Sequence, residues 1–429
     1  MRSLLLVLAC GSLILAQTPQ GQPAPLHLTL AEAEQLAVKN NPALSAAQFS
    51  ALAAGQVPLE VRSGLLPTVF GSATGVGADN GSRIGAGALN NPVLYSRLGT
   101  GITLNQLVTD FGRTRSLVES SKLHAAAEDQ ITETVRANIL FQTDRAYFGL
   151  LRALSVLTVA QQTVTARQLV SDQVTELARA SLKSQLDVSF AGVNLAQAKL
   201  QLSTARNQVS AASAQLAAAL GVPEGGGFAL SEEPMPDSPG TSADDYIQTA
   251  IQKRPELLNL RLETDSAEKN LAAEKALSRP AIGVIGTAGF VPAGEPNVPG
   301  RYGAIGANIN VPILNGGLFR ARRTEAEYRL QAVNKRVEDL RNRVIRDVRT
   351  AWLDAATAYE QVGLTAQLLD QAKLALDLAQ GRYDLGLGSI VELSQAQLNL
   401  TAAQIANASA KFDYMSQRSF LAYQAGTSR

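Results

Sequence analysis

RYGAIGANINVPILNGGLFR, Arg301 to Arg320, is the stretch of sequence that decides the fold of this chain. Its apolar residues alternate with polar or small ones, so that an extended chain has one apolar face and one polar face. The apolar set is Ile305, Ala307, Ile309, Val311 and Ile313. The alternation stops at Asn315-Gly316-Gly317, and from Leu318 a charged, alanine-rich pattern with helical spacing continues far along the chain. We therefore predict a strand that leads directly into a long helix.

A second copy of this junction lies earlier in the chain, in TGITLNQLVTDFGRTR, Thr100 to Arg115. The two copies match with a shift of 205 residues, and the segments before them match with a shift of 213. A register kept over such long intervals indicates an internal duplication. The matched pairs include Gly101 and Gly306, Asn105 and Asn310, Pro42 and Pro255, and Pro67 and Pro280.

The composition excludes several classes of function. The chain has 38 Lys and Arg against 37 Asp and Glu, without the basic block that a nucleic-acid partner would need. Its one cysteine, Cys10, allows neither an internal disulfide nor a multi-cysteine metal site. The sequence contains no phosphate-binding loop, no HExxH and no GxSxG motif, so we predict no enzyme, no cofactor and no metal.

The N-terminus has the pattern of a secretory signal peptide. Met1 to Ala16 carries one arginine followed by an apolar run that ends in small residues, and it is too short to span a membrane as a helix. We prefer cleavage after Ala16. The alternative is lipoprotein processing with a lipid on Cys10, and in both cases the chain leaves the cytoplasm.

The repeats predict the organisation of the whole chain. A flexible lead, 17–27, follows the signal peptide, 1–16, and a connector, 222–242, rich in proline and glycine joins the two repeats. Each repeat combines short helices, a strand hairpin, a long helix, a tight turn and a returning helix. In repeat 1, 28–221, the hairpin spans about 68–108, the long helix 112–178 and the return helix 185–220; in repeat 2, 243–426, the corresponding ranges are about 281–313, 317–383 and 390–425.

Strands of about ten residues have the length that crosses a membrane at a tilt. No stretch after the signal peptide is apolar enough for a helical span, so any crossing would use the strands. Four strands cannot close a barrel, and an open sheet in lipid leaves its edge groups unpaired. Other copies of the chain would therefore have to pair the edges: two copies would give eight strands, and three would give twelve with an open lumen. The alanine-rich helices favour the larger ring.

This duplicated arrangement resembles the TolC-like outer-membrane efflux protein family over nearly the whole chain, Leu28 to Gly426. The most specific pieces are the junction NVPILNGGLFRAR and the turn RYDLGLGSIVEL. The resemblance implies an α+β membrane protein: a homotrimer with a twelve-stranded β-barrel in the outer membrane and a coiled-coil, α-helical tunnel through the periplasm. It also implies a passive duct for efflux or type I secretion that works with a periplasmic adaptor (membrane fusion protein) and an inner-membrane pump.

The resemblance implies that the two turns between long and returning helices form the periplasmic tip where the adaptor docks. The second turn keeps its glycines, whereas the first has none, which puts equal docking at both turns in doubt. Any helical hairpin also needs a flexible turn, which is the alternative explanation of the glycines. The expected docking residues are Ala180, Ser181, Leu182 and Lys183 in the first turn and Arg382, Tyr383, Gly386, Leu387, Gly388 and Ser389 in the second.

Two further sets of residues are expected to line the duct. Thr103, Asn105, Asn308 and Asn310 lie on the polar side of the strands and would face the lumen, although an exposed sheet of a soluble protein could carry the same pattern. Near the tip, Asp187, Asp384 and Glu392 could form an acidic constriction, or serve as ordinary helix N-terminal charges and surface pairs. The competing function is a periplasmic coiled-coil adaptor or structural protein without a pore.

Overall fold

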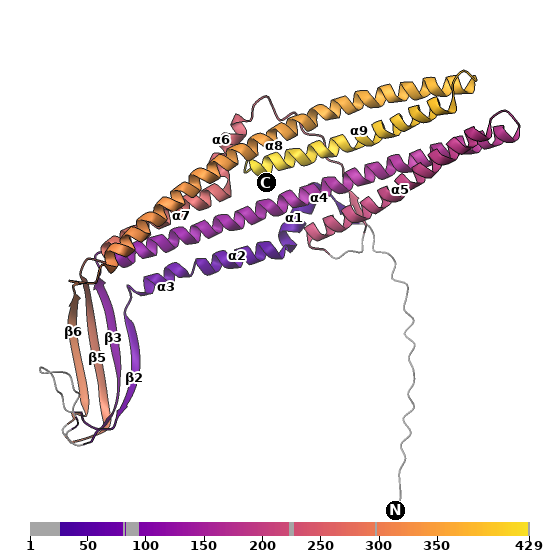
Figure 1. Cartoon of the computed structure of the whole chain (residues 1–429). Helices are drawn as coiled ribbons and strands as arrows, with labels where there is room; N and C mark the ends of the chain where they lie inside the picture. Colours follow the sequence, from indigo (N-terminus) through magenta and orange to yellow (C-terminus); the bar gives the residue numbers. More distant parts are fainter. Residues whose placement is uncertain (1–25, 80–81, 83–93, 223–226, 297, 428–429) are drawn as a thin grey trace, which may run out of the picture. The chain divides into compact units, whose positions relative to one another are not determined.

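The computed structural model describes residues 26–79, 82, 94–222, 227–296 and 298–427. The predicted signal peptide and Cys10 lie outside these ranges. Within them, no helix has the length and apolar character needed to cross a membrane. The elements of the first repeat are β1 (Leu26–Leu28), α1 (Leu30–Asn40), α2 (Pro42–Ala54), α3 (Val57–Ser63), β2 (Thr68–Val76), β3 (Arg97–Thr109), α4 (Arg113–Arg179) and α5 (Gln185–Leu220) (Figure 1). Those that follow are β4 (Phe228–Leu230), α6 (Asp244–Lys253), α7 (Pro255–Ala276), β5 (Ala281–Gly294), β6 (Arg301–Asn310), α8 (Leu318–Asp384) and α9 (Ile390–Gln424).

The described chain forms two compact units, and each of them takes segments from both repeats. Unit 1 contains the chain up to Asn41, Gln142–Ser238 and Thr357–Arg418, and unit 2 contains Pro42–Phe141, Pro239–Ala356 and the chain from Ser419. The units therefore do not coincide with the repeats that the sequence suggested. The repeats are intertwined because the long helices α4 and α8 each contribute residues to both units.

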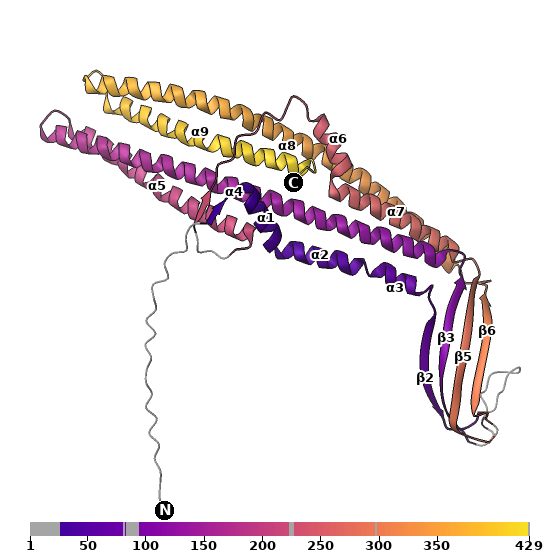
Figure 2. The same ribbon diagram turned by 180° about the vertical axis from the view of Figure 1, so that it is seen from behind.

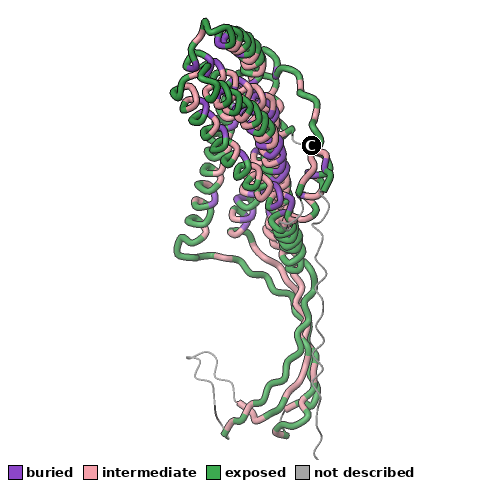
Figure 3. The backbone as a smooth tube through the Cα atoms, turned by 90° about the vertical axis from the view of Figure 1, so that its right-hand side faces the viewer, coloured by how far each residue is buried: buried purple, intermediate pink, exposed green. Residues whose placement is uncertain are grey.

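Unit 2 contains a four-stranded antiparallel sheet in the order β2-β3-β5-β6 (Figures 1 and 2). Each hairpin pairs within its own repeat, and the central pair, β3 with β5, joins the two repeats, with Ile102 opposite Ala288. The outer edges of the sheet are β2 and β6. Figure 3 shows that buried positions follow the helices, while the described strands of this sheet are intermediate or exposed.

The strand-to-helix junctions use left-handed backbone. Gly316 and Gly317 have φ of 62° and 84°, and the equivalent Phe111 and Gly112 have φ of 53° and 93°. β6 ends at Asn310, three residues before the predicted strand end at 313, so that Ile313 lies outside the sheet and is almost fully exposed. The helices that follow, α4 and α8, have 67 residues each, which corresponds to about 100 Å of helix.

The helical part of unit 2 has its own apolar core. Aliphatic residues of α6, α7, α8 and the end of α9 form it, with Ile247, Leu257, Val344, Val348 and Leu421 buried together. Trp352 packs against this core. The core explains why α6 and α7 form at all, since each buries its apolar face against the long helix.

Unit 1 contains a small parallel strand pair that the sequence did not predict. β1 pairs with β4, bringing the end of the lead, expected to be flexible, against the connector. Tyr147 of α4 is fully buried, and its hydroxyl lies 3.0 Å from the carbonyl oxygen of Leu28 and 2.6 Å from that of Ser231. Strands of three residues are too short to produce a recognisable alternation, which is why the pattern missed them.

Candidate functional site at the helical turns

The first helical turn connects α4 to α5 and reaches its geometry without glycine. Ser181 has a left-handed backbone, with φ of 60°. The Leu182 amide donates to the Leu177 carbonyl at 2.8 Å, which closes the end of α4. Ser184 then caps α5 through a capping box with Asp187. The carboxylate of Asp187 is thus engaged locally, because it accepts from the Ser184 amide at 2.9 Å.

The second turn connects α8 to α9, and here glycine carries the left-handed position: Gly386 has φ of 72°. A Cβ at Gly388 would lie 3.1 Å from the Cβ of Arg382, so the close return of the chain also favours glycine there. Arg382 holds the turn by donating to the Leu387 carbonyl at 3.1 Å and to the Glu392 carboxylate at 3.0 Å. The two turns therefore have similar local paths despite different sequences.

The two turns are in direct contact within unit 1. The Lys183 ammonium lies over the ring of Tyr383, 3.6 Å from its centroid, which is the geometry of a cation–π interaction. Tyr383 is buried in a small cluster with Ile390 and Leu393, against which Phe190 of α5 packs. Burial raises the pKa of the Tyr383 hydroxyl, and the negative charges of Asp187 and Asp384 act in the same direction.

Exposed apolar side chains gather at both turns. Leu182 is 69% exposed and Leu387 is 68% exposed, and Leu186, Leu385 and Val391 nearby are also largely exposed. Such a patch next to ordered, hydrogen-bonded backbone is typical of a surface that binds another protein. Of the predicted turn residues, only Tyr383 is buried, so the others remain accessible in the single chain.

The three acidic residues near the turns each have a local partner. Asp187 caps α5, Glu392 pairs with Arg382, and Asp384 accepts a hydrogen bond from Gln380 at 2.9 Å. These contacts account for the carboxylates within one chain. In a constriction formed with other copies, the same three carboxylates would face one another while keeping these local contacts.

The four strand residues predicted to face a lumen belong to unit 2 and share one face of its sheet. Thr103 is opposite Thr287 in the register, Asn308 is opposite Gly283, and Asn310 is opposite Ala281. This face is mixed, because Phe70 is opposite Thr103 and points the same way. The opposite face is more apolar and carries the exposed side chains of Val69, Ile102, Ile305 and Ile309.

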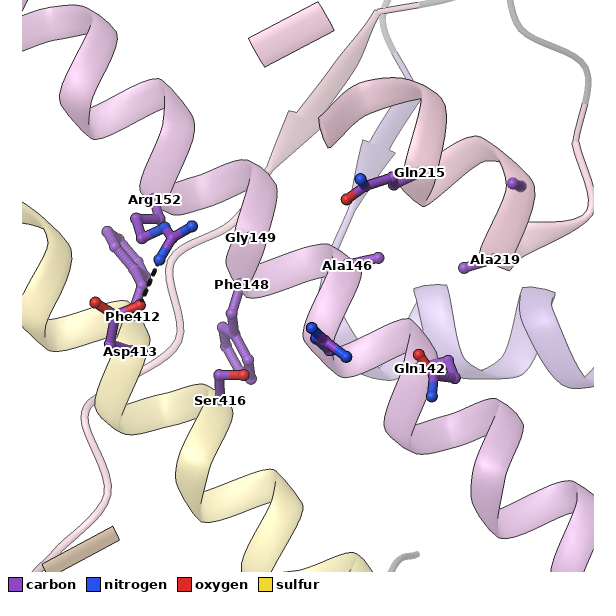
Figure 4. A pocket seen from close by; sticks show the side chains of 12 residues that line it. Gln142, Ala146, Phe148, Gly149, Arg152, Gln215, Ala219, Phe412, Asp413 and Ser416 are labelled. Atoms are coloured by element: carbon purple, nitrogen blue, oxygen red, sulfur yellow. Dashed lines mark hydrogen bonds and ion pairs between the residues drawn. The ribbon is translucent and has the colours of Figure 1, made fainter. Parts of the chain in front are cut away.

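A groove of about 570 Å³ lies between α4, α5 and α9 in unit 1 (Figure 4). Its wall contains an ion pair between Arg152 and Asp413, 2.8 Å apart, next to Phe148 and Phe412. Asp413 thus balances the charge of Arg152. Across the described ranges, no group of three or more His, Cys, Asp or Glu side chains is placed to hold a metal ion.

The contact between the two turns does not follow from the sequence pattern, although it joins two of the expected docking residues, Lys183 and Tyr383. In the sequence, Lys183 stands out only because the first turn lacks the glycines of the second. The signal that could have been used is the replacement of Gly388 by Lys183 at the equivalent position, which provides a side chain long enough to reach the neighbouring hairpin.

Known proteins share this architecture. "Outer membrane protein TolC" of Salmonella enteritidis is 25% identical over 421 residues, which is 93% of this chain and 83% of the relative. "Outer membrane efflux protein BepC" of Brucella suis is 25% identical over 95% of this chain and 87% of the relative. The crystal structure of the CmeC outer membrane channel of Campylobacter jejuni has a TM-score of 0.77 at 20% identity, covering 93% of this chain and 86% of that chain. VceC of Vibrio cholerae has a TM-score of 0.78 at 18% identity, covering 92% and 96%.

The family described as "Outer membrane efflux protein" matches residues 34–222 and 246–426, which include both junctions and both helical turns. These two segments contain most of both repeats. The resemblance expected from the junction and turn motifs is thereby confirmed: the chain belongs to the outer membrane efflux protein family.

Proposed function

We propose that this protein is the outer-membrane duct of a tripartite export system, in which copies of the chain together enclose the path of the exported molecule. An outer-membrane efflux channel is the function of its family, and the family match favours this function over the adaptor alternative. The observation that carries the proposal is the four-stranded sheet with two open edges, β2 and β6, on a chain whose helices reach about 100 Å.

The edges of the sheet support a trimer. In lipid, each unpaired backbone group would cost several kcal/mol, so β6 of one copy would pair with β2 of the next. Three copies provide twelve strands, enough to leave an open lumen. The apolar face that carries Ile305 and Ile309 would then meet lipid, and the face that carries Asn308 and Asn310 would meet water.

The apolar patch at the turns supports docking of a periplasmic adaptor, through which an inner-membrane pump would be coupled to the duct. Leu182 and Leu387 are exposed apolar anchors. The cation–π contact between Lys183 and Tyr383, here called the clasp, joins the two turns that carry them. Because Ser181 adopts the left-handed backbone that Gly386 has, both turns could bind in a similar way. An acidic constriction at Asp187, Asp384 and Glu392 remains a prediction for the assembled trimer.

We assign no catalysis to this chain, in keeping with a family of passive channels. Its specificity would come from the pump. A duct of this kind would carry drugs, metal ions or polypeptides according to the pump that it serves.

The proposal is tested in cells that lack the gene and are complemented with wild type, Leu387→Asp or Gly386→Pro. A charge at Leu387 should remove an apolar anchor and weaken the complex with the adaptor by about tenfold or more. Proline cannot adopt the positive φ of Gly386, so its variant should remodel the turn. We expect both variants to accumulate an exported dye while their oligomer in the outer-membrane fraction remains heat-modifiable.

The matched control is Leu364→Asp, since Leu364 is 54% exposed on the same helix but far along it from the turn. This variant should export normally. Full export by Leu387→Asp at normal protein levels would argue against docking at the turn. Recovery of the wild-type chain as a soluble periplasmic monomer would refute the duct itself.

A further inference from the structure

Arg167 of α4 is a buried cation without a partner. Arg167 is only 5% exposed. Its Nη1 atom is buried and has no hydrogen-bond acceptor. Loss of solvent around the guanidinium lowers the pKa of Arg167. Arg254, the other arginine in the buried set of the described residues, instead has the Glu256 carboxylate 3.0 Å from its Nε. A buried charge normally requires such compensation.

No carboxylate is among the residues that line the groove at Arg167. Arg167 lines this groove of about 560 Å³ in unit 1, between α4, α5 and α9, in which it is the one charged residue. The other lining residues are small, apolar or neutral polar: Thr163, Asn194, Gln197, Ala198, Gln201, Leu398, Asn399, Thr401, Ala402, Ile405 and Ala406. The groove therefore has positive charge and amide groups but no internal counter-charge.

Packing does not explain the arginine. At the equivalent position of the second repeat, 205 residues later, Ala372 is also buried. The equivalent helical position thus holds an alanine in the second repeat, and the arginine is a feature of the first repeat alone. Retaining an unpaired guanidinium where a methyl group suffices indicates a use for its charge.

The polar groups of the groove are suited to an anion. Asn399 accepts a hydrogen bond from Gln395 on its Oδ1, which leaves its Nδ2 available to donate. Gln197 and Gln201 are exposed at the same groove and carry further amide donors. Together with the guanidinium, which binds oxyanions through several N–H groups, they form a donor-rich site.

We propose that this groove binds a small oxyanion, of the sulfate or phosphate type, whose charge balances Arg167. The site is distinct from the turns and from the groove at Arg152, and it does not depend on the export function. It would make the stability of the helical part depend on the anions around it.

The test is thermal unfolding of the full-length, detergent-solubilised protein titrated with sodium sulfate, against sodium chloride at equal ionic strength. Sulfate should raise the unfolding midpoint of the wild type in a saturable way. Arg167→Met should weaken sulfate binding by about tenfold or more and, because an apolar side chain needs no counter-charge, should not be less stable without sulfate. Arg206→Met, at an exposed arginine of α5, should respond like the wild type.

A second variant keeps the test decisive if Arg167→Met does not fold. Asn399→Asp places a carboxylate at an exposed position of the same groove, which should stabilise the protein without sulfate and abolish the sulfate response. Equal responses to sulfate and chloride in the wild type would overturn the proposal, as would an unchanged sulfate response in both groove variants.

Discussion

Replacing Gly221 by alanine should destabilise unit 1 strongly for a change of one methyl group. Gly221 ends α5 with φ of 65°, and its amide closes the last helical turn. A Cβ at this position would lie 3.0 Å from the Cβ of Asn40 and 3.2 Å from its carbonyl oxygen. The side chain of Asn40 also donates to the Leu220 carbonyl at 3.3 Å, so the methyl group would disturb the contact that satisfies the end of α5.

The magnitude follows from two contributions. The left-handed conformation costs about 1–2 kcal/mol for a residue with a Cβ. Displacing Asn40 costs about 1 kcal/mol more, the net value of one hydrogen bond. We therefore expect Gly221→Ala to lower the free energy of unfolding by about 2–3 kcal/mol. Gly192→Ala, in the interior of the same helix with no atom within 4 Å of the added Cβ, should instead raise it by about 0.5–1 kcal/mol.

The assay is urea unfolding of the detergent-solubilised full chain, followed by far-ultraviolet circular dichroism, with the three proteins compared at equal concentration. The opposite signs of the two glycine variants are the decisive result. A neutral or stabilising effect of Gly221→Ala would refute the assignment of backbone strain and close packing at this position. A loss at Gly192 as large as at Gly221 would show that glycine is needed in α5 for another reason.

Three further outcomes are expected from buried groups. Tyr147→Phe should cost about 1–3 kcal/mol, because the carbonyl oxygens of Leu28 and Ser231 lose their shared hydroxyl donor, and thermal unfolding measures this loss. Burial raises the pKa of Tyr147 to about 12, whereas an unfolded tyrosine has a pKa of about 10. The unfolded chain therefore ionises first, so that the stability of the wild type should fall as the pH rises from about 10 to 12, and Tyr147→Phe should show a shallower fall in the same titration. Leu257→Ala should cost about 2–5 kcal/mol in urea unfolding because Leu257 is 1% exposed in the core of unit 2, whereas Leu364→Ala, at an exposed leucine, should change the value little; similar losses in both would contradict that core.

The long elements could be predicted because their patterns are long. α5 occupies Gln185–Leu220 where the sequence predicted 185–220, and α4 occupies Arg113–Arg179 where it predicted 112–178. Each of these helices repeats its apolar spacing over many turns, and glycine or a capping serine marks an end. Among the short helices expected before the first hairpin, composition did not indicate the break near Gly55 that separates α2 from α3.

Contacts between distant segments could not be predicted in this way. The pairing of β1 with β4, the clasp between Lys183 and Tyr383 and the isolation of Arg167 all depend on which helices become neighbours. Periodicity identifies the buried face of a helix, but it does not state which residue lies opposite. The glycine pattern also suggested a difference between the turns, whereas Ser181 adopts the left-handed backbone unaided.

The pairing of β3 with β5 sets an order of events for a newly made chain. Thr100 and Phe290 are neighbours in the sheet but are separated by 190 residues. At about 5–20 residues per second, a ribosome needs roughly 10 to 40 seconds to supply the second partner. Until then, β3 is paired on one side only, with β2. Its other edge exposes unpaired backbone groups beside apolar side chains, and such an edge invites aggregation. If the chain is exported while it is being made, a periplasmic chaperone would have to shield β2 and β3 during this interval.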